Sequence, residues 1–327
     1  MKAAVRSIYG SPDVIHLQET DIPSPKSNEV LVRVYATTVN RTDCAILSGK
    51  PWISRFFTGL FKPAIPITGT DFAGKIMSAG KKVRSFKTGD RVMGFGGMGI
   101  ASHAEYLALG EDKIITTIPG NTTYEEAAAS MEGAIYALSS MIDKVHPKAG
   151  QRALVNGASG AIGSAAVQLL KYFGVHVTAV CDTKNIALIK SLGADQVVDF
   201  SLEDFTKSEE RCHFIFDTVG KSSFSKCSPL LLPGGIYISS DPGPKWENAY
   251  LPLTTSIAGN KKVFFAIPFH MRRSLFLIRY LIEQGRFRPV IDRRYNLENI
   301  ADAYRYVASG QKTGNVVISL EGSSDYP

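Results

Sequence analysis

Hydrophobic and polar residues follow two different periods along this chain of 327 residues. Before residue 120 the apolar runs are short, and the run Val30–Ala36 alternates with period two, as a half-buried strand does. Beyond that point Thr123 and Glu126 have the spacing of a capping box, and a helical pattern follows. The pattern therefore predicts a β-rich segment over residues 1–120 and a helix over 127–145.

Residues 152–240 alternate between short apolar runs and helical patterns. This alternation is typical of βαβ units, and strands this apolar suit a parallel sheet covered on both faces. The strands are expected near 152–156, 175–181, 196–199, 213–218 and 235–240. The helix after Lys184 should end at Leu192-Gly193, because glycine suits the left-handed position that follows a helix. Further on, we expect a helix over 273–284 and a last strand over 314–320.

The first of these strands leads into the glycine-rich turn Gly157-Ala-Ser-Gly160-Ala-Ile-Gly163. Gly160 would let the backbone approach a pyrophosphate, and Gly163 would let the next helix pack closely on the strand. The main-chain N–H groups that would face the phosphates, at the positive end of the helix, are those of Ser159, Gly160, Ala161 and Ile162. An acidic residue about 20 positions further on completes the arrangement of a dinucleotide site. The turn therefore predicts dinucleotide binding, and a tight strand-to-helix turn without a ligand is the alternative.

Length and composition fit a two-domain α/β protein, and no apolar run reaches the roughly 18 residues needed to span a bilayer. The start of the chain lacks the apolar core of a signal peptide. Four cysteines lie far apart, which predicts free thiols in a reducing cytoplasm. The net charge of +7 could attract nucleic acid, but it is scattered and lacks an aromatic–basic RNA-binding signature. A solvated basic surface is therefore the expected explanation.

Short motifs follow one another along nearly the whole chain. They are Val39-Asn40-Arg-Thr-Asp43, Gly69-Thr-Asp71-Phe-Ala-Gly74, Gly89-Asp90-Arg91-Val92, Ala104-Glu105-Tyr106, the turn at 157–163, Leu192-Gly-Ala-Asp195, Phe216-Asp217-x-Val-Gly220 and Gly314-Asn315-Val-Val. Together they resemble the medium-chain dehydrogenase/reductase superfamily, in its zinc-free quinone oxidoreductase-like branch. The resemblance implies an α/β protein with a GroES-like β-rich catalytic domain, made from residues 1–122 and 268–327. It also implies a Rossmann domain with a doubly wound parallel sheet over 123–267, a cofactor cleft where the domains meet, and a homodimer.

The residues at the expected metal position differ from those of zinc-dependent relatives. Zinc alcohol dehydrogenases of this superfamily have a cysteine where this chain has Asn40, and Gly-His-Glu where it has Gly69-Thr70-Asp71. An amide and a hydroxyl are poor zinc ligands compared with thiolate and imidazole. The four-cysteine lobe that holds a structural zinc has no counterpart either. We therefore expect no metal site and no zinc mechanism.

The residues after the second Rossmann strand bear on the choice between NADPH and NADH. An acidic residue at the end of that strand normally binds the ribose of NAD and repels the extra phosphate of NADP. Here that position is Cys181, and Thr183 and Lys184 can donate to a 2′-phosphate, as the matching residues do in related reductases. Asp182 departs from that pattern. The sequence favours NADPH and leaves NADH open, with Lys184 as an ordinary solvated helix residue as the alternative.

Further cofactor contacts are expected from later segments of the chain. Val219 and Ser239 lie near the ends of later strands, where an open parallel sheet binds its ligand. The resemblance implies that Asn315 reaches the nicotinamide side, and a role as a turn residue is the alternative. The aromatic-rich segment 245–272 is a candidate pocket wall or subunit contact, or else buried core.

The resemblance implies hydride transfer to a quinone or an α,β-unsaturated carbonyl compound. Such attack places negative charge on the carbonyl oxygen of the acceptor, and a hydrogen-bond donor near that oxygen lowers the barrier. Asn40 takes the position of a metal ligand and its amide can donate, whereas Asp43 can orient neighbouring groups. These two are the candidate catalytic residues, and a structural hydrogen-bonding role is the alternative for each.

Three departures from the family pattern keep other functions open. Ala45 and Pro51 stand where quinone reductases often carry tyrosines, and Ile135 stands where a threonine usually faces the nicotinamide. The alternatives are an enoyl-thioester reductase and a non-catalytic protein that senses NADP(H) or binds RNA. Activity that needs a thioester, or tight cofactor binding without turnover, would distinguish them from a quinone or enone reductase.

Overall fold

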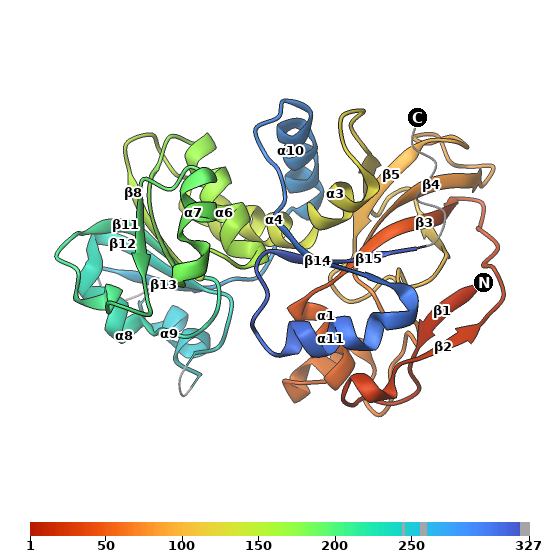
Figure 1. Cartoon of the computed structure of the whole chain (residues 1–327), viewed down its shortest axis with the longest axis horizontal. Helices are drawn as coiled ribbons and strands as arrows, with labels where there is room; N and C mark the ends of the chain where they lie inside the picture. Colours follow the sequence, from red (N-terminus) through yellow and green to blue (C-terminus); the bar gives the residue numbers. More distant parts are fainter. Residues whose placement is uncertain (244–245, 256–259, 321–327) are drawn as a thin grey trace. The chain divides into compact units, whose positions relative to one another are not determined.

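The computed structural model describes residues 1–243, 246–255 and 260–320 (Figure 1). The chain divides into two compact units. Unit 1 comprises Met1–Glu132 and Leu275–Pro327, and unit 2 comprises Gly133–Ser274. Both ends of the chain therefore contribute to unit 1, whereas one continuous stretch forms unit 2. Within the described ranges, no helix is long and apolar enough to cross a membrane.

Unit 1 is built on a seven-stranded sheet with the order β14-β15-β3-β4-β5-β7, in which β6 also pairs with β3. The strands are β3 (Glu29–Val39), β4 (Asp71–Ala79), β5 (Arg91–Phe95), β6 (Tyr106–Gly110), β7 (Ile114–Thr117), β14 (Ile291–Asn296) and β15 (Asn315–Ser319). A separate antiparallel pair is formed by β1 (Lys2–Val5) and β2 (His16–Glu19). The predicted alternation lies in β3, where Val30, Val32 and Val34 point inward and are buried. Antiparallel pairing of β15 with β3 joins the two ends of the chain.

Helices of unit 1 cover this sheet and carry part of its core. They are α1 (Arg41–Ser48), α2 (Arg55–Thr58), α3 (Tyr124–Ala129) and α11 (Ile300–Ala308), with α10 (Met271–Glu283) running from unit 2 into unit 1. The amphipathic α11 buries Ile300, Tyr304 and Val307 in the same apolar cluster as the inward residues of β3. The predicted helix over 273–284 and the predicted last strand are thereby confirmed as α10 and β15.

The predicted single helix over 127–145 is wrong. The capping box is present, because Thr123 accepts from the Glu126 N–H and starts α3, but α3 stops at Ala129. The chain continues as α4 (Glu132–Tyr136), a π-helical segment (Ala137–Ile142) and α5 (Asp143–Val145). The hydroxyl groups of three serines donate to carbonyl oxygens four residues earlier, those of Ser130, Ser139 and Ser140. Such bonds compete with the helical main-chain ladder and loosen it, which the apolar pattern does not reveal.

Unit 2 contains a six-stranded sheet with the order β10-β9-β8-β11-β12-β13, and every neighbouring pair is parallel. The strands are β8 (Arg152–Asn156), β9 (His176–Cys181), β10 (Gln196–Asp199), β11 (Cys212–Asp217), β12 (Leu231–Ser239) and β13 (Lys262–Phe265). The first five confirm the predicted strands. The chain moves outward from β8 in one direction and from β11 in the other, so the strand order reverses between these two strands.

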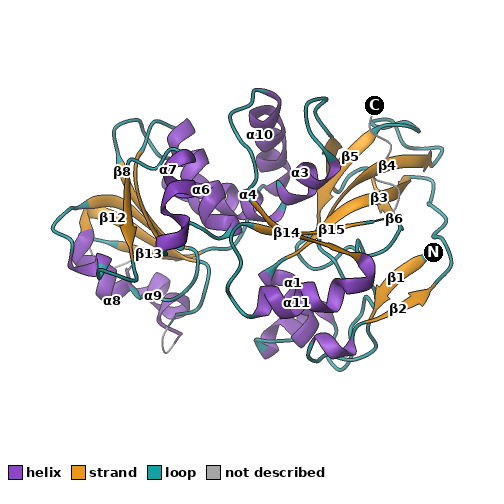
Figure 2. Ribbon diagram, viewed as in Figure 1, coloured by secondary structure: helices purple, strands orange, loops and turns teal. Residues whose placement is uncertain are grey.

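The helices of unit 2 lie on both faces of its sheet (Figure 2). Those that follow strands of the sheet are α6 (Ala161–Tyr172), α7 (Ile186–Ser191), α8 (Phe224–Cys227) and α9 (Glu247–Thr255). Right-handed crossovers place α6 and α7 on one face, and α8 and α9 on the other, because the two halves run in opposite directions. The helix after Lys184 ends as predicted, with Gly193 at a φ of 99°. A doubly wound parallel sheet of this kind binds ligands where its strand order reverses.

Candidate functional site

The glycine turn after β8 requires glycine at two of its positions for different reasons. A Cβ atom at Gly163 would lie 2.2 Å from the Gly157 carbonyl oxygen and 2.7 Å from Ala158 Cα, so α6 packs directly on the turn, as predicted. Gly157 itself has a φ of 80°, a left-handed conformation that favours glycine. At Gly160 a Cβ would meet only Gly157 oxygen at an ordinary 3.5 Å, so the protein leaves space beside this residue.

Main-chain N–H groups near this space are partly available. The N–H of Gly160 donates to Gly157 oxygen at 3.1 Å and is therefore used inside the turn, unlike the expectation from sequence. No side chain caps the start of α6, so the N–H groups of Ala161 and Ile162 keep their helical orientation toward the open side. Ser159, Ala161 and Ile162 are all partly exposed. These observations fit the diphosphate of a dinucleotide, which needs an uncapped helix start and close backbone approach.

Asp217, at the end of β11, organises the neighbouring loop. Its carboxylate is fully buried and accepts from Asn156 Nδ2 at 3.1 Å, from the Gly220 N–H at 3.0 Å and from the Tyr237 hydroxyl at 3.0 Å. Val219 follows it, and a Cβ on Gly157 would lie 2.4 Å from Val219 Cγ1. The structure therefore brings Val219 against the glycine turn at the carboxyl edge of the sheet.

Other predicted cofactor residues of unit 2 have partners within the protein. Ser239 is buried and its hydroxyl donates to the Asp241 carbonyl oxygen at 3.0 Å, closing the turn after β12. Lys184 lies 3.7 Å from the Asp182 carboxylate, with 61% of its side chain exposed. Hydrogen bonding from the Thr183 hydroxyl lowers the pKa of the Asp199 carboxyl below its usual value. Thr183 and Lys184 thus lie beside acidic groups at the ends of β9 and β10.

The candidate catalytic residues of unit 1 lie at the start of α1. Asn40 is buried at the N-cap, and its main-chain N–H donates to Asp43 Oδ2 at 2.8 Å. The Asn40 amide donates to Thr38 Oγ1 at 2.6 Å and to Asp71 Oδ2 at 3.2 Å. Both hydrogens of that amide therefore have acceptors inside the protein. The structure brings Asn40 and Asp43 together, as the shared motif predicts.

Three buried carboxyl groups surround this helix start. Thr70 Oγ1 lies 3.3 Å from Asp43 Oδ2 and 2.9 Å from Glu132 Oε2. One hydroxyl hydrogen cannot serve both carboxylates, so a proton on one of the two acids completes the pair of bonds. Burial raises the pKa of all three acids: that of Asp43 lies well above its usual range, that of Glu132 is raised, and that of Asp71 reaches about 8. The pKa of about 8 means that Asp71 holds a proton near neutral pH.

Lys312 and Glu132 are functional candidates that the sequence did not reveal. Burial lowers the pKa of Lys312 to about 8, while the negative charge of Glu132 opposes that shift. The Lys312 ammonium also donates to the Gly314 carbonyl oxygen. Glu132 precedes the helical segments of unit 2 in the chain, and Lys312 precedes β15, so no local spacing connects the two residues.

Asn315 begins β15 next to this cluster. The register pairs Val316 with Val39, which places Asn315 across from Asn40. Its amide donates to the Val290 carbonyl oxygen at 3.0 Å, and its main-chain N–H donates to the same oxygen at 2.8 Å. The side chain therefore ties the start of β15 to the chain before β14.

The remaining sequence candidates are the aromatic segment 245–272 and the four cysteines. Of the aromatic segment 245–272, residues 245 and 256–259 lie outside the described residues; Trp246, Tyr250 and Phe269 are about half exposed. Lys144 lies over the Phe269 ring, 5.1 Å from its centroid. The four cysteines are free, and burial raises the pKa of the Cys44 thiol to about 12, which makes it a poor nucleophile.

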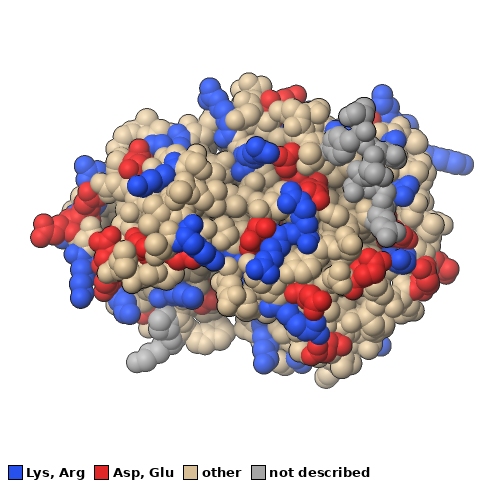
Figure 3. All heavy atoms as spheres, viewed as in Figure 1, with Lys and Arg blue, Asp and Glu red and all other residues tan. Residues whose placement is uncertain are grey.

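The surface charge is mixed on the face shown in Figure 3, where it does not form one basic field. On the face shown in Figure 3, basic and acidic side chains alternate. Arg305 pairs with Asp13 and Asp302, and Arg294 pairs with Glu125 at 2.7 Å. These pairs neutralise part of the net positive charge locally.

The residues at the expected metal position do not fit zinc. The Asn40 amide and the Thr70 hydroxyl are poor ligands, and both are hydrogen-bonded to carboxyl groups. Nearby His103 is buried, and burial lowers its pKa to about 4. Its Nε2 donates to the Thr38 carbonyl oxygen, so Nδ1 accepts from the Thr68 hydroxyl at 2.8 Å and both nitrogens are occupied. In the part of the chain that is described, no group of three or more potential ligands could hold a metal ion.

Known proteins similar to this chain share its whole length. Two family models match it: the alcohol dehydrogenase GroES-like domain over residues 26–140, and the zinc-binding dehydrogenase model over residues 192–318, a range that contains neither Asn40 nor Thr70. The chloroplast envelope quinone oxidoreductase homolog of Arabidopsis thaliana is 32% identical, with 94% of each chain covered. The chloroplastic NADPH-dependent alkenal/one oxidoreductase of the same plant is 28% identical, with 97% of this chain and 79% of the relative covered.

Among solved structures, the quinone oxidoreductase from Coxiella burnetii has the same fold. The TM-score is 0.86 at 24% sequence identity, with 98% of this chain and 99% of the other covered. Together with the two family models and the Arabidopsis quinone oxidoreductase homolog, this likeness extends over both units. The chain therefore belongs to the medium-chain dehydrogenase/reductase superfamily, in its quinone oxidoreductase-like branch.

Proposed function

We propose that this protein is a zinc-independent, NADPH-dependent oxidoreductase that transfers a hydride to a quinone or an α,β-unsaturated carbonyl compound. The names of two relatives describe a quinone oxidoreductase homolog and an NADPH-dependent alkenal/one oxidoreductase. The observation that carries the proposal is the glycine turn. At Gly163 the neighbouring backbone excludes a side chain, whereas at Gly160 only a bound ligand would exclude one. Glycine at position 160 therefore fits dinucleotide binding better than a structural requirement.

The cofactor would contact residues at the carboxyl edge of the unit 2 sheet. We infer that its pyrophosphate lies against Ser159, Gly160, Ala161 and Ile162, with Val219 and Ser239 beside it. Lys184 would turn from Asp182 to a 2′-phosphate, since an exposed ion pair contributes little and releases its lysine easily. Thr183 would be the second donor. The nearby Asp182 and Asp199 reduce this preference, so NADH remains a possible cofactor.

When bound, the nicotinamide supplies the hydride, and residues of unit 1 would stabilise the charge that the hydride leaves on the acceptor. Asn40 would donate to the carbonyl oxygen, using the hydrogen that now contacts Asp71 Oδ2 at the longer distance of 3.2 Å. Asp43 accepts the Asn40 main-chain N–H and so fixes the start of α1. Asn315 lies across from Asn40 and would limit the space available to the acceptor on that side.

The same cluster can provide the proton that completes the reduction. Asp43 and Glu132 would share a proton through Thr70 Oγ1, and burial raises the pKa of both acids, which favours retention of that proton until it is needed. Lys312, with a pKa of about 8, would replace it from solvent. Proton delivery is then a property of unit 1 alone and needs no metal-bound water.

The test is the oxidation of NADPH by the purified chain with a simple quinone and with an enone. We expect turnover that a chelator leaves unchanged, and faster turnover with NADPH than with NADH. A requirement for a coenzyme A or carrier-protein thioester would support an enoyl-thioester reductase instead. Tight NADPH binding without turnover across a broad panel of acceptors would support the sensor function, and salt-sensitive RNA binding would support an RNA-binding role. We also propose a homodimer in a reducing cytoplasmic compartment, to be tested by light scattering and by localisation of the tagged chain.

A further inference from the structure

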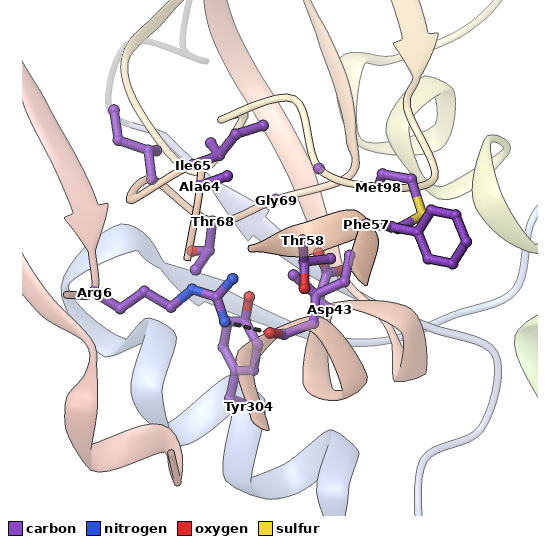
Figure 4. A pocket seen from close by; sticks show the side chains of 13 residues that line it. Arg6, Asp43, Phe57, Thr58, Ala64, Ile65, Thr68, Gly69, Met98 and Tyr304 are labelled. Atoms are coloured by element: carbon purple, nitrogen blue, oxygen red, sulfur yellow. Dashed lines mark hydrogen bonds between the residues drawn. The ribbon is translucent and has the colours of Figure 1, made fainter. Parts of the chain in front are cut away.

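A cavity of about 100 Å³ lies within unit 1, apart from the glycine turn (Figure 4). Its polar wall consists of Arg6, Asp43, Thr68 and Tyr304, which are at most 4% exposed. Its opening is apolar, since Phe57 is 71% exposed and Met98 is 48% exposed. In Figure 4 the side chains of Arg6, Asp43 and Tyr304 approach one another, Arg6 from the chain after β1, Asp43 from α1 and Tyr304 from α11. We call this cavity the Arg6 pocket.

Arg6 is a buried cation, and none of the described carboxylates forms an ion pair with it, although the Asp43 charge opposes the lowering of its pKa by burial. It follows β1, and its main-chain N–H donates to the Pro66 carbonyl oxygen at 3.0 Å. The guanidinium donates through Nη1 to the Ile46 carbonyl oxygen and lies 5.3 Å from the centroid of the Tyr9 ring. Its Nε is buried and has no hydrogen-bond partner among the described residues. A buried charge in this state lowers stability unless an anion compensates it.

Asp43 presents a second unused polar atom to the same pocket. Its Oδ2 is occupied by the Asn40 N–H and by Thr70, but its Oδ1 is buried and unpartnered within the described part of the chain. Burial first, and then the charges of Glu132 and Asp71, raise its pKa well above the usual range. This direction favours the protonated carboxyl, which could donate a hydrogen bond through Oδ1. With Asp43 protonated, the pocket would hold the Arg6 charge and two donors, Arg6 Nε–H and Asp43 Oδ1–H, that have no acceptor among the described residues.

We propose that the Arg6 pocket binds the carboxylate group of a small organic acid, whose apolar part lies between Phe57 and Met98. A planar guanidinium matches a carboxylate in shape and charge, and Asp43, when protonated, would donate to the same group. A cavity of about 150 Å³ holds a benzene ring, so about 100 Å³ holds a carboxylate and its first carbons, with the rest at the opening. The site lies in unit 1 and shares Asp43 with the proton-delivering cluster proposed above, but binding without dinucleotide tests it separately from turnover.

Binding of a matched acid and amide to the full chain, without dinucleotide, tests this proposal. The probes are 4-bromobenzoate and 4-bromobenzamide, which differ in charge but hardly in shape, measured by isothermal titration calorimetry. We expect the acid to bind at least about tenfold more tightly than the amide. Equal affinities, or no binding of the acid below about 10 mM, would overturn the proposal.

Two pairs of variants locate the binding site. Arg6→Gln should abolish the preference for the acid, whereas Arg55→Gln should preserve it. Arg55 is a matched control, because it also lies over the Tyr9 ring, 4.6 Å from the centroid, and donates to a main-chain oxygen, that of Gly49. Arg55 does not line the pocket. Equal losses in the two variants would show a general charge effect and refute the assigned site.

The second pair changes the opening without touching buried residues. Met98→Glu introduces a negative charge there, and Met98→Gln is its neutral control of nearly the same shape. We expect Met98→Glu to bind 4-bromobenzoate more weakly than Met98→Gln does, with equal binding of the amide. Because Met98 is half exposed, this comparison decides the question even if Arg6→Gln does not fold. Identical binding of the acid by these two variants would contradict the proposal.

Discussion

Gly160 and Gly163 allow ligand binding and folding to be separated by two substitutions of the same size. Gly160 has a φ of −75° and a ψ of 173°, an extended conformation that alanine also adopts. A Cβ there makes an ordinary contact of 3.5 Å, so Gly160→Ala should change the free energy of unfolding by less than about 1 kcal/mol. At Gly163 the Cβ would lie 2.2 Å from a backbone oxygen, and Gly163→Ala should cost about 1–3 kcal/mol because the turn has to shift.

Dinucleotide binding, in contrast to stability, should be weakened more by Gly160→Ala than by Gly163→Ala. The new methyl group would occupy the space through which a phosphate approaches the start of α6. Loss of one hydrogen bond to a charged group is worth about 1.5–3 kcal/mol, so the Kd of NADPH should rise between about tenfold and about a hundredfold. Gly163→Ala should chiefly lower the thermal midpoint, by about 2–4 °C for each kcal/mol lost.

The measurements are NADPH fluorescence titration and thermal unfolding without dinucleotide, made on the unsubstituted chain and both variants. The reasoning fails if Gly160→Ala binds NADPH as tightly as the unsubstituted chain. It also fails if Gly163→Ala unfolds at an unchanged temperature, because the steric argument would then be wrong. A large loss of stability in Gly160→Ala would mean that the glycine has a structural role.

Three further expectations concern the cofactor, the acceptor and the buried acids. Lys184→Gln should weaken NADPH binding about tenfold and leave NADH binding unchanged, because only NADPH carries the 2′-phosphate; equal effects in titrations with both cofactors would exclude that contact. Asn40→Ala should lower kcat with a quinone by about a hundredfold through loss of one donor, and an unchanged steady-state kcat would remove Asn40 from the reacting atoms. The pKa of Asp71 is about 8 in the folded chain, compared with 3.8 for a free carboxyl group, which represents the unfolded chain. As the pH rises between these two values, the folded chain binds this proton and the unfolded chain does not, so the free energy of unfolding decreases. Between about pH 6.5 and about pH 8, the free energy of unfolding measured with urea should decrease in the unsubstituted chain and decrease less in Asp71→Asn. An equal decrease in the two proteins would contradict this explanation.

The strands of unit 2 could be predicted from sequence because each is a continuous apolar run. In β9, Val177, Ala179 and Val180 are fully buried, which a strand covered on both faces requires. β13 was missed, since it lies in a segment with four prolines and no clear period. The helix over 127–145 failed for a different reason: the serine hydroxyls that interrupt it act through individual bonds, which periodicity does not register.

Only part of the candidate site could be predicted from the sequence. Asn40 and Asp43 were identified because they belong to one short motif on one turn of helix. Thr70, Glu132 and Lys312 complete the cluster from distant segments: the pairing of β15, β3 and β4 brings Thr70 and Lys312 near α1, and Glu132 comes from the start of α4. The sequence did not reveal Arg6 either, because its burial depends on contacts with the distant residues Pro66 and Ile46.

The buried acids and Arg6 lower the stability of unit 1, and that cost is itself an argument for function. A carboxyl group with a raised pKa and a guanidinium without an anion are both less stable inside a protein than apolar residues of similar size. Structural hydrogen bonding accounts for Asp71, which accepts from Thr38 and Asn40. It does not account for Asp43 Oδ1 or Arg6 Nε, two buried atoms that have no partner among the described residues and belong to side chains that line one cavity. Perturbed, incompletely paired groups at a cavity are typical of binding sites. The loss of stability therefore arises at a place where a bound ligand would offset it.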